Sequence, residues 1–156
     1  MTSFVDQVRQ LLNRKQDNER WTLVLQTVLR EFQSETATIH RLEPQANLLR
    51  LVAQIGVPAE VLPAISTIPV GKGIAGETAA RNAPVTVCNL QTDASGITQP
   101  QAKQTGVIGA LCVPIRQAGL LLGTLGVGSR TKPEYGAADL TKLEAVASVL
   151  GDLGLD

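Results

Sequence analysis

The sequence has few of the residues that mark several specialised classes of protein. Its 156 residues include 2 cysteines and 3% aromatics, and 14 Lys and Arg balance 14 Asp and Glu, so the formal net charge is zero. A chain without a basic excess lacks the electrostatic footprint of a general nucleic-acid binder or of a membrane-surface protein. The scarcity of aromatic rings argues against aromatic cages and base-stacking platforms. The expected partners are therefore small molecules or other proteins, not nucleic acid or membrane.

Long apolar runs and targeting signals are absent from the sequence as well. No stretch approaches the roughly 18 uninterrupted apolar residues of a membrane-spanning helix, and residues 1–7 show no basic segment leading into an apolar one. Cys88 and Cys112 fit neither a secreted disulfide pattern nor a CxxC pair. We therefore expect a cytoplasmic protein in which both cysteines are buried, reduced structural thiols.

Two kinds of hydrophobic periodicity divide the chain. Spacing typical of helices is expected over residues 3–14, 19–33, 77–81 and 137–150, with little more than one further turn within 59–64. Alternating or continuous apolar runs predict strands over residues 36–42, 48–55, 84–90, 107–116 and 120–129. The polar stretch 91–104 is predicted to be a long loop. We expect one domain over residues 1–156, with an N-terminal helix and linker over 1–18 and a core over 19–151.

The order of these elements predicts the fold class. Two helices precede a hairpin, and a second hairpin precedes the last helix, so the paired strands are expected to run antiparallel. Strands 107–116 and 120–129 are apolar on both faces, which indicates that both faces are covered. We therefore predict an α+β fold with an α/β/α arrangement, in which a central antiparallel β-sheet lies between helical layers.

Several motifs follow one another in an informative order. Residues 68–76 read Ile-Pro-Val-Gly-Lys-Gly-Ile-Ala-Gly, residues 109–115 read Gly-Ala-Leu-Cys-Val-Pro-Ile, and residues 123–127 read Gly-Thr-Leu-Gly-Val. With the closing helix after residue 137, they resemble the GAF domain family over roughly residues 19–151. The resemblance implies a small-molecule sensor or a regulatory dimerisation domain in signal transduction, because many unrelated ligand sites have been built on this scaffold. It names no ligand and no cofactor.

One subgroup allows a test residue by residue. The free methionine-R-sulfoxide reductases are stand-alone GAF proteins with motifs like Gly-Val-Cys-Gly and Leu-Asp-Ile-Asp-Ser. The matching stretches here read Gly-Ile-Ala-Gly over 73–76 and Leu-Gly-Val-Gly-Ser over 125–129. Such a reductase needs a thiolate, a resolving thiol and acidic groups, whereas this chain has Ala75, Gly126 and Gly128 at those positions. We therefore predict a non-enzymatic protein without catalytic residues.

Two other subgroups are also disfavoured. Bilin attachment uses a cysteine followed by histidine or set in an Asp-x-Cys-Phe motif, whereas asparagine follows Cys88 and valine follows Cys112. The Asn-Lys-x-Phe-Asp-Glu signature of cyclic-nucleotide-binding members is absent from the sequence. The identity of the ligand stays open.

The candidate ligand-binding residues gather around one face of the last two strands. Cys112 lies two residues after Ala110, so the two share a face, and the resemblance to the reductases implies that this face and that of Thr124 border the pocket. Small residues there predict a roomy floor of low charge, which either suits an apolar or weakly polar ligand or is filled from above; we favour the filled core. The predicted ligand-binding set is Ile74, Cys88, Leu90, Asp93, Ala110, Cys112, Thr124 and Gly126.

Three further features have an ordinary structural interpretation that we prefer. Residues 71–73, Gly-Lys-Gly, precede a helix as an anion site would, but they lack a phosphate-loop ending and indicate a turn and a helix start. His40 is the single histidine, too few for a protein metal site although sufficient for haem, and we expect a plain surface or strand histidine. Asp93 begins a polar loop placed where GAF lids often lie, and we expect it to be solvated.

Two alternative functions remain. If strands 84–90 and 107–116 are neighbours, Cys88 and Cys112 define a divergent thiol-based redox protein, although no basic residue adjoins either thiol. A degenerate GAF domain would bind only protein. The wide apolar stripes of the first, second and last helices predict a homodimer, unless they simply cover the outer face of the sheet. A signalling effector protein is a further expected partner.

Overall fold

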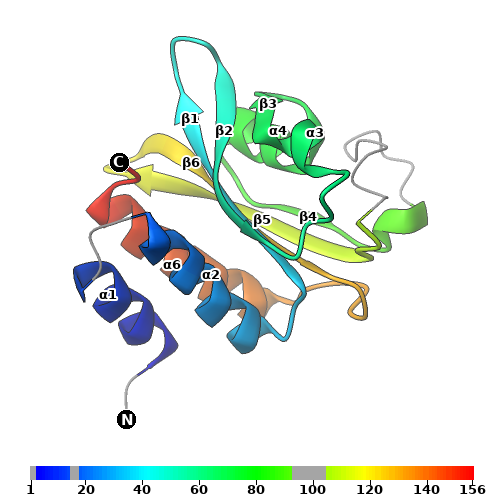
Figure 1. Ribbon diagram of the computed structural model, residues 1–156, viewed down its shortest axis with the longest axis horizontal. Coiled ribbons are helices and arrows are strands. Elements are labelled where there is room, and N and C mark those ends of the chain that lie inside the picture. Colours follow the sequence, from blue (N-terminus) through cyan, green and yellow to red (C-terminus); the bar gives the residue numbers. More distant parts are fainter. Residues whose placement is uncertain (1–2, 15–17, 93–104) are drawn as a thin grey trace.

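Helices and strands alternate along the chain in the computed structural model, which describes residues 3–14, 18–92 and 105–156 (Figure 1). The helices are α1 (Phe4–Arg14), α2 (Glu19–Phe32), α3 (Leu62–Ser66), α4 (Gly73–Arg81) and α6 (Ala137–Leu153), with a 3-10 turn, η1, at Leu90–Thr92. The strands are β1 (Thr36–Glu43), β2 (Leu48–Ile55), β3 (Thr67–Pro69), β4 (Val85–Val87), β5 (Gly109–Gln117) and β6 (Leu120–Ser129).

Polar caps set the ends of several helices. The backbone N–H of Asp6 donates to Ser3 Oγ (3.1 Å) at the start of α1, as their spacing predicts. At the start of α6 the backbone N–H of Gly136 donates to Asp139 Oδ2 (2.8 Å). Helices α2 and α4 each end at a left-handed residue, Gln33 and Asn82. These caps satisfy backbone groups that helix ends leave without intrahelical partners.

The strands form a six-stranded sheet in the order β3-β2-β1-β6-β5-β4. Each neighbouring pair is antiparallel. The central pairing joins β1 to β6, two strands far apart in the sequence, with Thr36 opposite Gly128 and His40 opposite Thr124. This pairing brings the two predicted hairpins together in one sheet.

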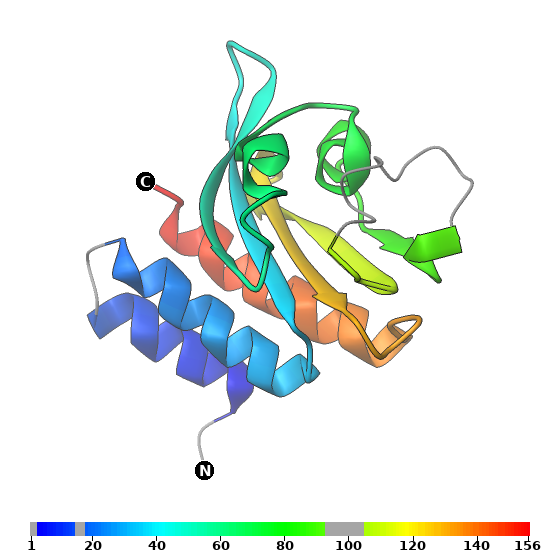
Figure 2. The same ribbon diagram turned by 45° about the vertical axis from the view of Figure 1, so that its right-hand side comes forward.

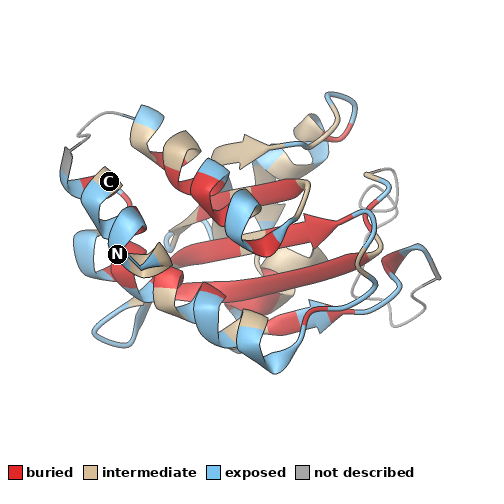
Figure 3. Cartoon of the chain, turned by 90° about the horizontal axis from the view of Figure 1, so that it is seen from below, coloured by how far each residue is buried: buried red, intermediate tan, exposed pale blue. Residues whose placement is uncertain are grey.

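Helical layers cover both faces of the sheet (Figures 1 and 2). Helices α1, α2 and α6 lie on one face, where Ile39, Val113 and Leu125 are fully buried against them. Helices α3 and α4 lie on the other face. Figure 3 shows how much of β1, β5 and β6 is buried between the layers. The predicted α+β fold with an antiparallel sheet between helical layers is confirmed.

Some element boundaries differ from the prediction. The short strand β3 was not expected, because three residues are too few to show alternation, yet Ile68 pairs with Leu49. The strand predicted over residues 84–90 ends at Val87, since Asn89 takes a left-handed φ of 53° and leads into η1. Helix α4 begins at Gly73, four residues before the predicted start at Glu77.

The apolar stripes of the three outer helices are buried within the chain. Val8 of α1, Trp21 of α2 and Leu143 of α6 belong to one hydrophobic cluster on the sheet. Among the described residues, the large apolar side chains that stay exposed are Leu120 (68%) and Leu153 (50%). The stripes therefore no longer support the predicted homodimer, which stays untested. No described helix combines the length and apolar character that crossing a membrane requires.

Candidate functional site

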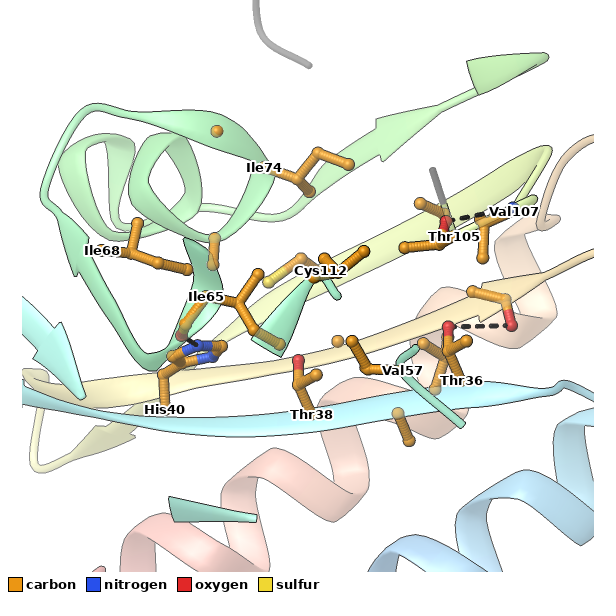
Figure 4. Close-up of a pocket in the computed structure, with 18 of the residues that line it drawn as sticks. Thr36, Thr38, His40, Val57, Ile65, Ile68, Ile74, Thr105, Val107 and Cys112 are labelled. Carbon is orange, nitrogen blue, oxygen red and sulfur yellow. Dashed lines mark hydrogen bonds between the residues drawn. The ribbon is translucent and has the colours of Figure 1, made fainter. Parts of the chain in front are cut away.

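A cavity of about 480 Å³ lies between the sheet and the segments that carry α3 and α4 (Figure 4). Its floor comes from the three central strands, and its walls come from residues 57–75 and from the chain on either side of the undescribed segment 93–104. The floor residues are Thr36, Ala37, Thr38, His40, Ala110, Leu111, Cys112, Gly126, Val127 and Gly128. The wall residues are Val57, Val61, Ala64, Ile65, Ile68, Pro69, Lys72, Gly73, Ile74, Ala75, Leu90, Thr105 and Val107.

The strand register builds the floor from rows of small side chains. Gly128 lies between Thr36 and Ala110, and in the next row Gly126 lies between Thr38 and Cys112. A Cβ atom at position 126 would lie 3.3 Å from Thr38 Oγ1 and 3.6 Å from Cys112 Sγ. Strand β6 thus contributes almost no side-chain volume to the floor, and this leaves room for the cavity.

Five of the eight predicted ligand-binding residues lie on the lining of this cavity: Ile74, Leu90, Ala110, Cys112 and Gly126. Thr124 is buried in the next row and is not part of the lining, while Cys88 is exposed elsewhere. Asp93 lies outside the described residues. The preferred filled core is wrong, because Ile74 packs with the cluster of Leu90, Val107 and Ala110 at the wall and a volume of about 480 Å³ stays open beside it.

The two cysteines lie too far apart for a redox pair. Cys112 is paired with Val85 on β4, three residues before Cys88. Three strand residues span about 10 Å, which is beyond the separation a disulfide bridges. The strands are neighbours, as the redox hypothesis requires, but the cysteines are out of register.

Neither thiol has the lowered pKa that makes a cysteine reactive. Burial raises the pKa of Cys112 to about 11, against the opposing influence of the Thr78 and Thr124 hydroxyls. For Cys88, desolvation and then the neighbouring Glu134 raise the pKa, and its Sγ donates to Glu134 Oε2 (3.5 Å). The expectation of two buried thiols holds for Cys112 and is wrong for Cys88, which is exposed.

His40 is a strand histidine, as one of the two expectations had it, but it is buried on the cavity floor and is not a surface residue. It lies on β1 and is only 2% exposed. Its Nε2 lies 2.9 Å from the carbonyl oxygen of Ile65, and a carbonyl only accepts, so Nε2 carries the proton and donates. Burial lowers the pKa of His40 more than this bond raises it, so the ring is neutral at pH 7. The ring ties the floor to α3.

Sequence reasoning missed His40 and the β1 face although a signal was present. Thr36, Thr38 and His40 alternate with the apolar Ala37 and Ile39, and that alternation puts the three on one face. What the sequence did not give is the pairing of β1 with β6, which sets this face beside Gly126.

The Gly-Lys-Gly turn forms the start of α4, as expected, and also borders the cavity. The backbone N–H of Gly71 donates to the Gly76 carbonyl (2.8 Å), and that of Lys72 donates to the Pro69 carbonyl (3.0 Å). Lys72 is the one charged side chain among the described lining residues, and it is exposed. The described part of the chain holds no group of three or more His, Cys, Asp or Glu suited to a metal ion.

A sequence model of the GAF domain family matches residues 19–153. The chain belongs to the GAF family. Among curated proteins, none matches the sequence significantly. In this GAF domain the three positions that separate it from the reductase motifs, Ala75, Gly126 and Gly128, all line the cavity.

Solved structures that resemble this GAF domain belong to proteins of different kinds. The free methionine-R-sulfoxide reductase of Neisseria meningitidis, solved with its substrate, has a TM-score of 0.81 at 16% identity, covering 96% of this chain and 85% of that one. A GAF domain from an Acinetobacter phosphoenolpyruvate-protein phosphotransferase gives 0.79 at 16%, covering 98% and 94%. A putative GAF sensor protein from Burkholderia vietnamiensis gives 0.79 at 19%, covering 97% and 90%. At such low identity these likenesses show the fold alone.

Proposed function

We propose that this GAF domain is a non-enzymatic sensor that binds a small molecule in the cavity above β1, β5 and β6. The observation that carries the proposal is the open volume of about 480 Å³ over a floor of glycine and small side chains. Ligand sites typically measure roughly 300–1,000 Å³. Protein interiors are otherwise close-packed, because voids forfeit dispersion contacts. A ligand would fill this space.

The lining indicates a mainly apolar ligand. Isoleucine, valine, leucine and alanine dominate the described walls, and the one charged lining residue, Lys72, is exposed and free to stay solvated. A highly charged ligand would leave its solvation shell without gaining charged partners there. The proposed ligand is therefore apolar or weakly polar.

The state of the polar groups supports a binding role over an enzymatic one. Cys112 is the thiol on the cavity lining, and with a pKa of about 11 it is almost fully protonated at neutral pH, whereas the thiolate is the reactive form. His40 uses its Nε2–H to hold Ile65. The likeness to the reductases concerns the fold, and Ala75, Gly126 and Gly128 replace the groups that their chemistry implies.

A route for the signal is part of the proposal. Alternate residues of β5 face opposite sides, so Cys112 borders the cavity while the side chain of Val113 belongs to the cluster under the helices. Helix α6 packs on this strand so closely that a Cβ at Gly151 would overlap the Arg116 carbonyl. A shift of the floor would move α6, and we infer a cytoplasmic homodimer that passes this movement to an effector protein.

Native mass spectrometry of gently purified protein, compared with the denatured mass, tests the function. We expect a reproducible non-covalent adduct on the wild type and on Ala138→Val, an exposed substitution on α6. Gly126→Val, whose added methyl groups enter the cavity, should lose the adduct while it keeps its fold by circular dichroism.

Two results would argue against the sensor. One is an adduct that survives Gly126→Val unchanged. The other is a bare wild-type protein that no compound in a metabolite library stabilises against heat. The native mass spectrum also reports whether the chain is a dimer.

A further inference from the structure

His40 offers the cavity a hydrogen-bond acceptor that no residue in the described part of the chain uses. The Ile65 carbonyl fixes the proton on Nε2, so the lone pair of the neutral ring is on Nδ1. Nδ1 is buried and has no hydrogen-bond partner among the described residues. Buried polar atoms without partners are rare in native proteins, and each calls for an explanation.

The immediate neighbours of the ring do not supply the missing donor. Thr124 lies directly opposite His40 on β6, and its hydroxyl, which lowers the pKa of Cys112 by a hydrogen bond, makes none to Nδ1. Thr38, two residues along β1, presents its hydroxyl to the same cavity (Figure 4). The acceptor therefore belongs to a cavity lining that is mostly apolar.

The part of the cavity wall beside the His40 ring can move to admit a ligand. Nδ1 is covered in this structure, so a donor reaches it only when nearby side chains shift. Helix α3, which holds Ile65 over the ring, has five residues and none of them is buried. A segment with so few buried contacts opens at low cost.

We propose that His40 selects the ligand of this cavity by accepting a hydrogen bond at Nδ1 from an N–H or O–H group of a neutral, mainly apolar molecule. This inference rests on the proposed function and adds the chemical class of the ligand. An anion finds Lys72 as the one charged side chain among the described lining residues, and that side chain is exposed. A cation finds no carboxylate among the described lining residues to compensate its lost hydration. A neutral donor satisfies the ring without either cost.

Indole and 1-methylindole form a pair of probes with the same bicyclic ring, in which a methyl group replaces the N–H proton. Titration of the ¹⁵N-labelled protein, followed by amide shifts of the cavity residues, gives a dissociation constant for each probe. We expect indole to bind the wild type about fivefold more tightly, the factor that one neutral hydrogen bond typically contributes. The ¹⁵N resonance of Nδ1 should shift with indole and not with 1-methylindole.

Two variants isolate the acceptor. His40→Phe removes both ring nitrogens, whereas His40→Gln keeps an amide donor near Ile65 and an acceptor at Oε1. The preference for indole should fall to about onefold in His40→Phe and be retained in part in His40→Gln. The Nδ1 resonance is read on the wild type, so this part of the test stands even if a variant does not fold.

The outcomes separate the two proposals. Equal binding of both probes to the wild type, or a preference for indole that survives in His40→Phe, overturns the role of His40 and leaves the sensor intact. If neither probe shifts the cavity amides, the role of His40 in selecting a neutral apolar donor is overturned, and the sensor stands or falls by the adduct and library experiments.

Discussion

At the scale of single residues, the burial of His40 ties the stability of the protein to pH. Burial lowers the pKa of the folded ring below its ordinary value of 6.5, so below that pH the unfolded chain binds a proton that the folded chain does not. The contribution of the neutral ring to stability is fully present above pH 6.5 and is lost as the pH falls from 6.5 toward the lower pKa of the folded ring. The sequence has one histidine, and carboxylates titrate mostly below pH 5.

We predict that the free energy of unfolding falls between pH 6.5 and 5.0, by at most about 1.4 kcal/mol per pH unit for one proton. Urea unfolding at a series of pH values measures this slope. His40→Gln should give a nearly flat profile over the same range. Parallel profiles for the two proteins would mean that His40 titrates alike in the folded and unfolded chains.

The two cysteines should differ sharply in reactivity. Cys88 is exposed and Cys112 is buried with a pKa of about 11, so in the native protein at pH 8 a thiol reagent should modify one cysteine, and unfolding should release the second. Cys88→Ser should leave no fast-reacting thiol. Mass spectrometry after diamide treatment should find no disulfide bond between Cys88 and Cys112. Such a disulfide would support the redox hypothesis.

At the scale of elements, the quality of each prediction follows the length of its periodic signal. The strand predicted over residues 120–129 matches β6 in both ends, because ten residues and a glycine-containing turn define it well. Strand β3 has three residues and exists through its pairing with β2. Helix α4 starts at Gly73, a weak helix former, because the turn before it positions the first residues.

Helix α6 depends on a close approach to β5 at Gly151. An ideal Cβ there would lie 1.8 Å from the Arg116 carbonyl oxygen, so Gly151→Ala forces the helix away from the strand. We predict a loss of about 3 kcal/mol in the free energy of unfolding, although alanine favours a free helix by about 1 kcal/mol. Chemical denaturation measures this change.

The matched control for Gly151→Ala is Ser148→Ala on the exposed side of α6. This substitution should change the free energy of unfolding by less than about 0.5 kcal/mol. Equal stabilities for the two variants would mean that α6 is free to move away from β5.

At the scale of the whole molecule, the sequence predicts the fold better than it predicts the site. Periodicity and turn residues define each long element and predict the layered sheet. The cavity depends on what the sequence does not show directly: that β1 pairs with β6, and that Ile74 and Leu90 stand at the walls. The glycines at 126 and 128 predict space on the floor, but only the packing of α3 and α4 decides whether that space is filled.

The pairing of β1 with β6 has a consequence for the synthesis of the protein. A chain leaving the ribosome makes most of the wall residues, those within 57–75, long before it makes Gly126 and Gly128. The floor closes only when β6 inserts between β1 and β5, a contact between distant parts of the chain that forms slowly. A growing chain is therefore unable to capture the ligand until nearly all of the domain has been translated.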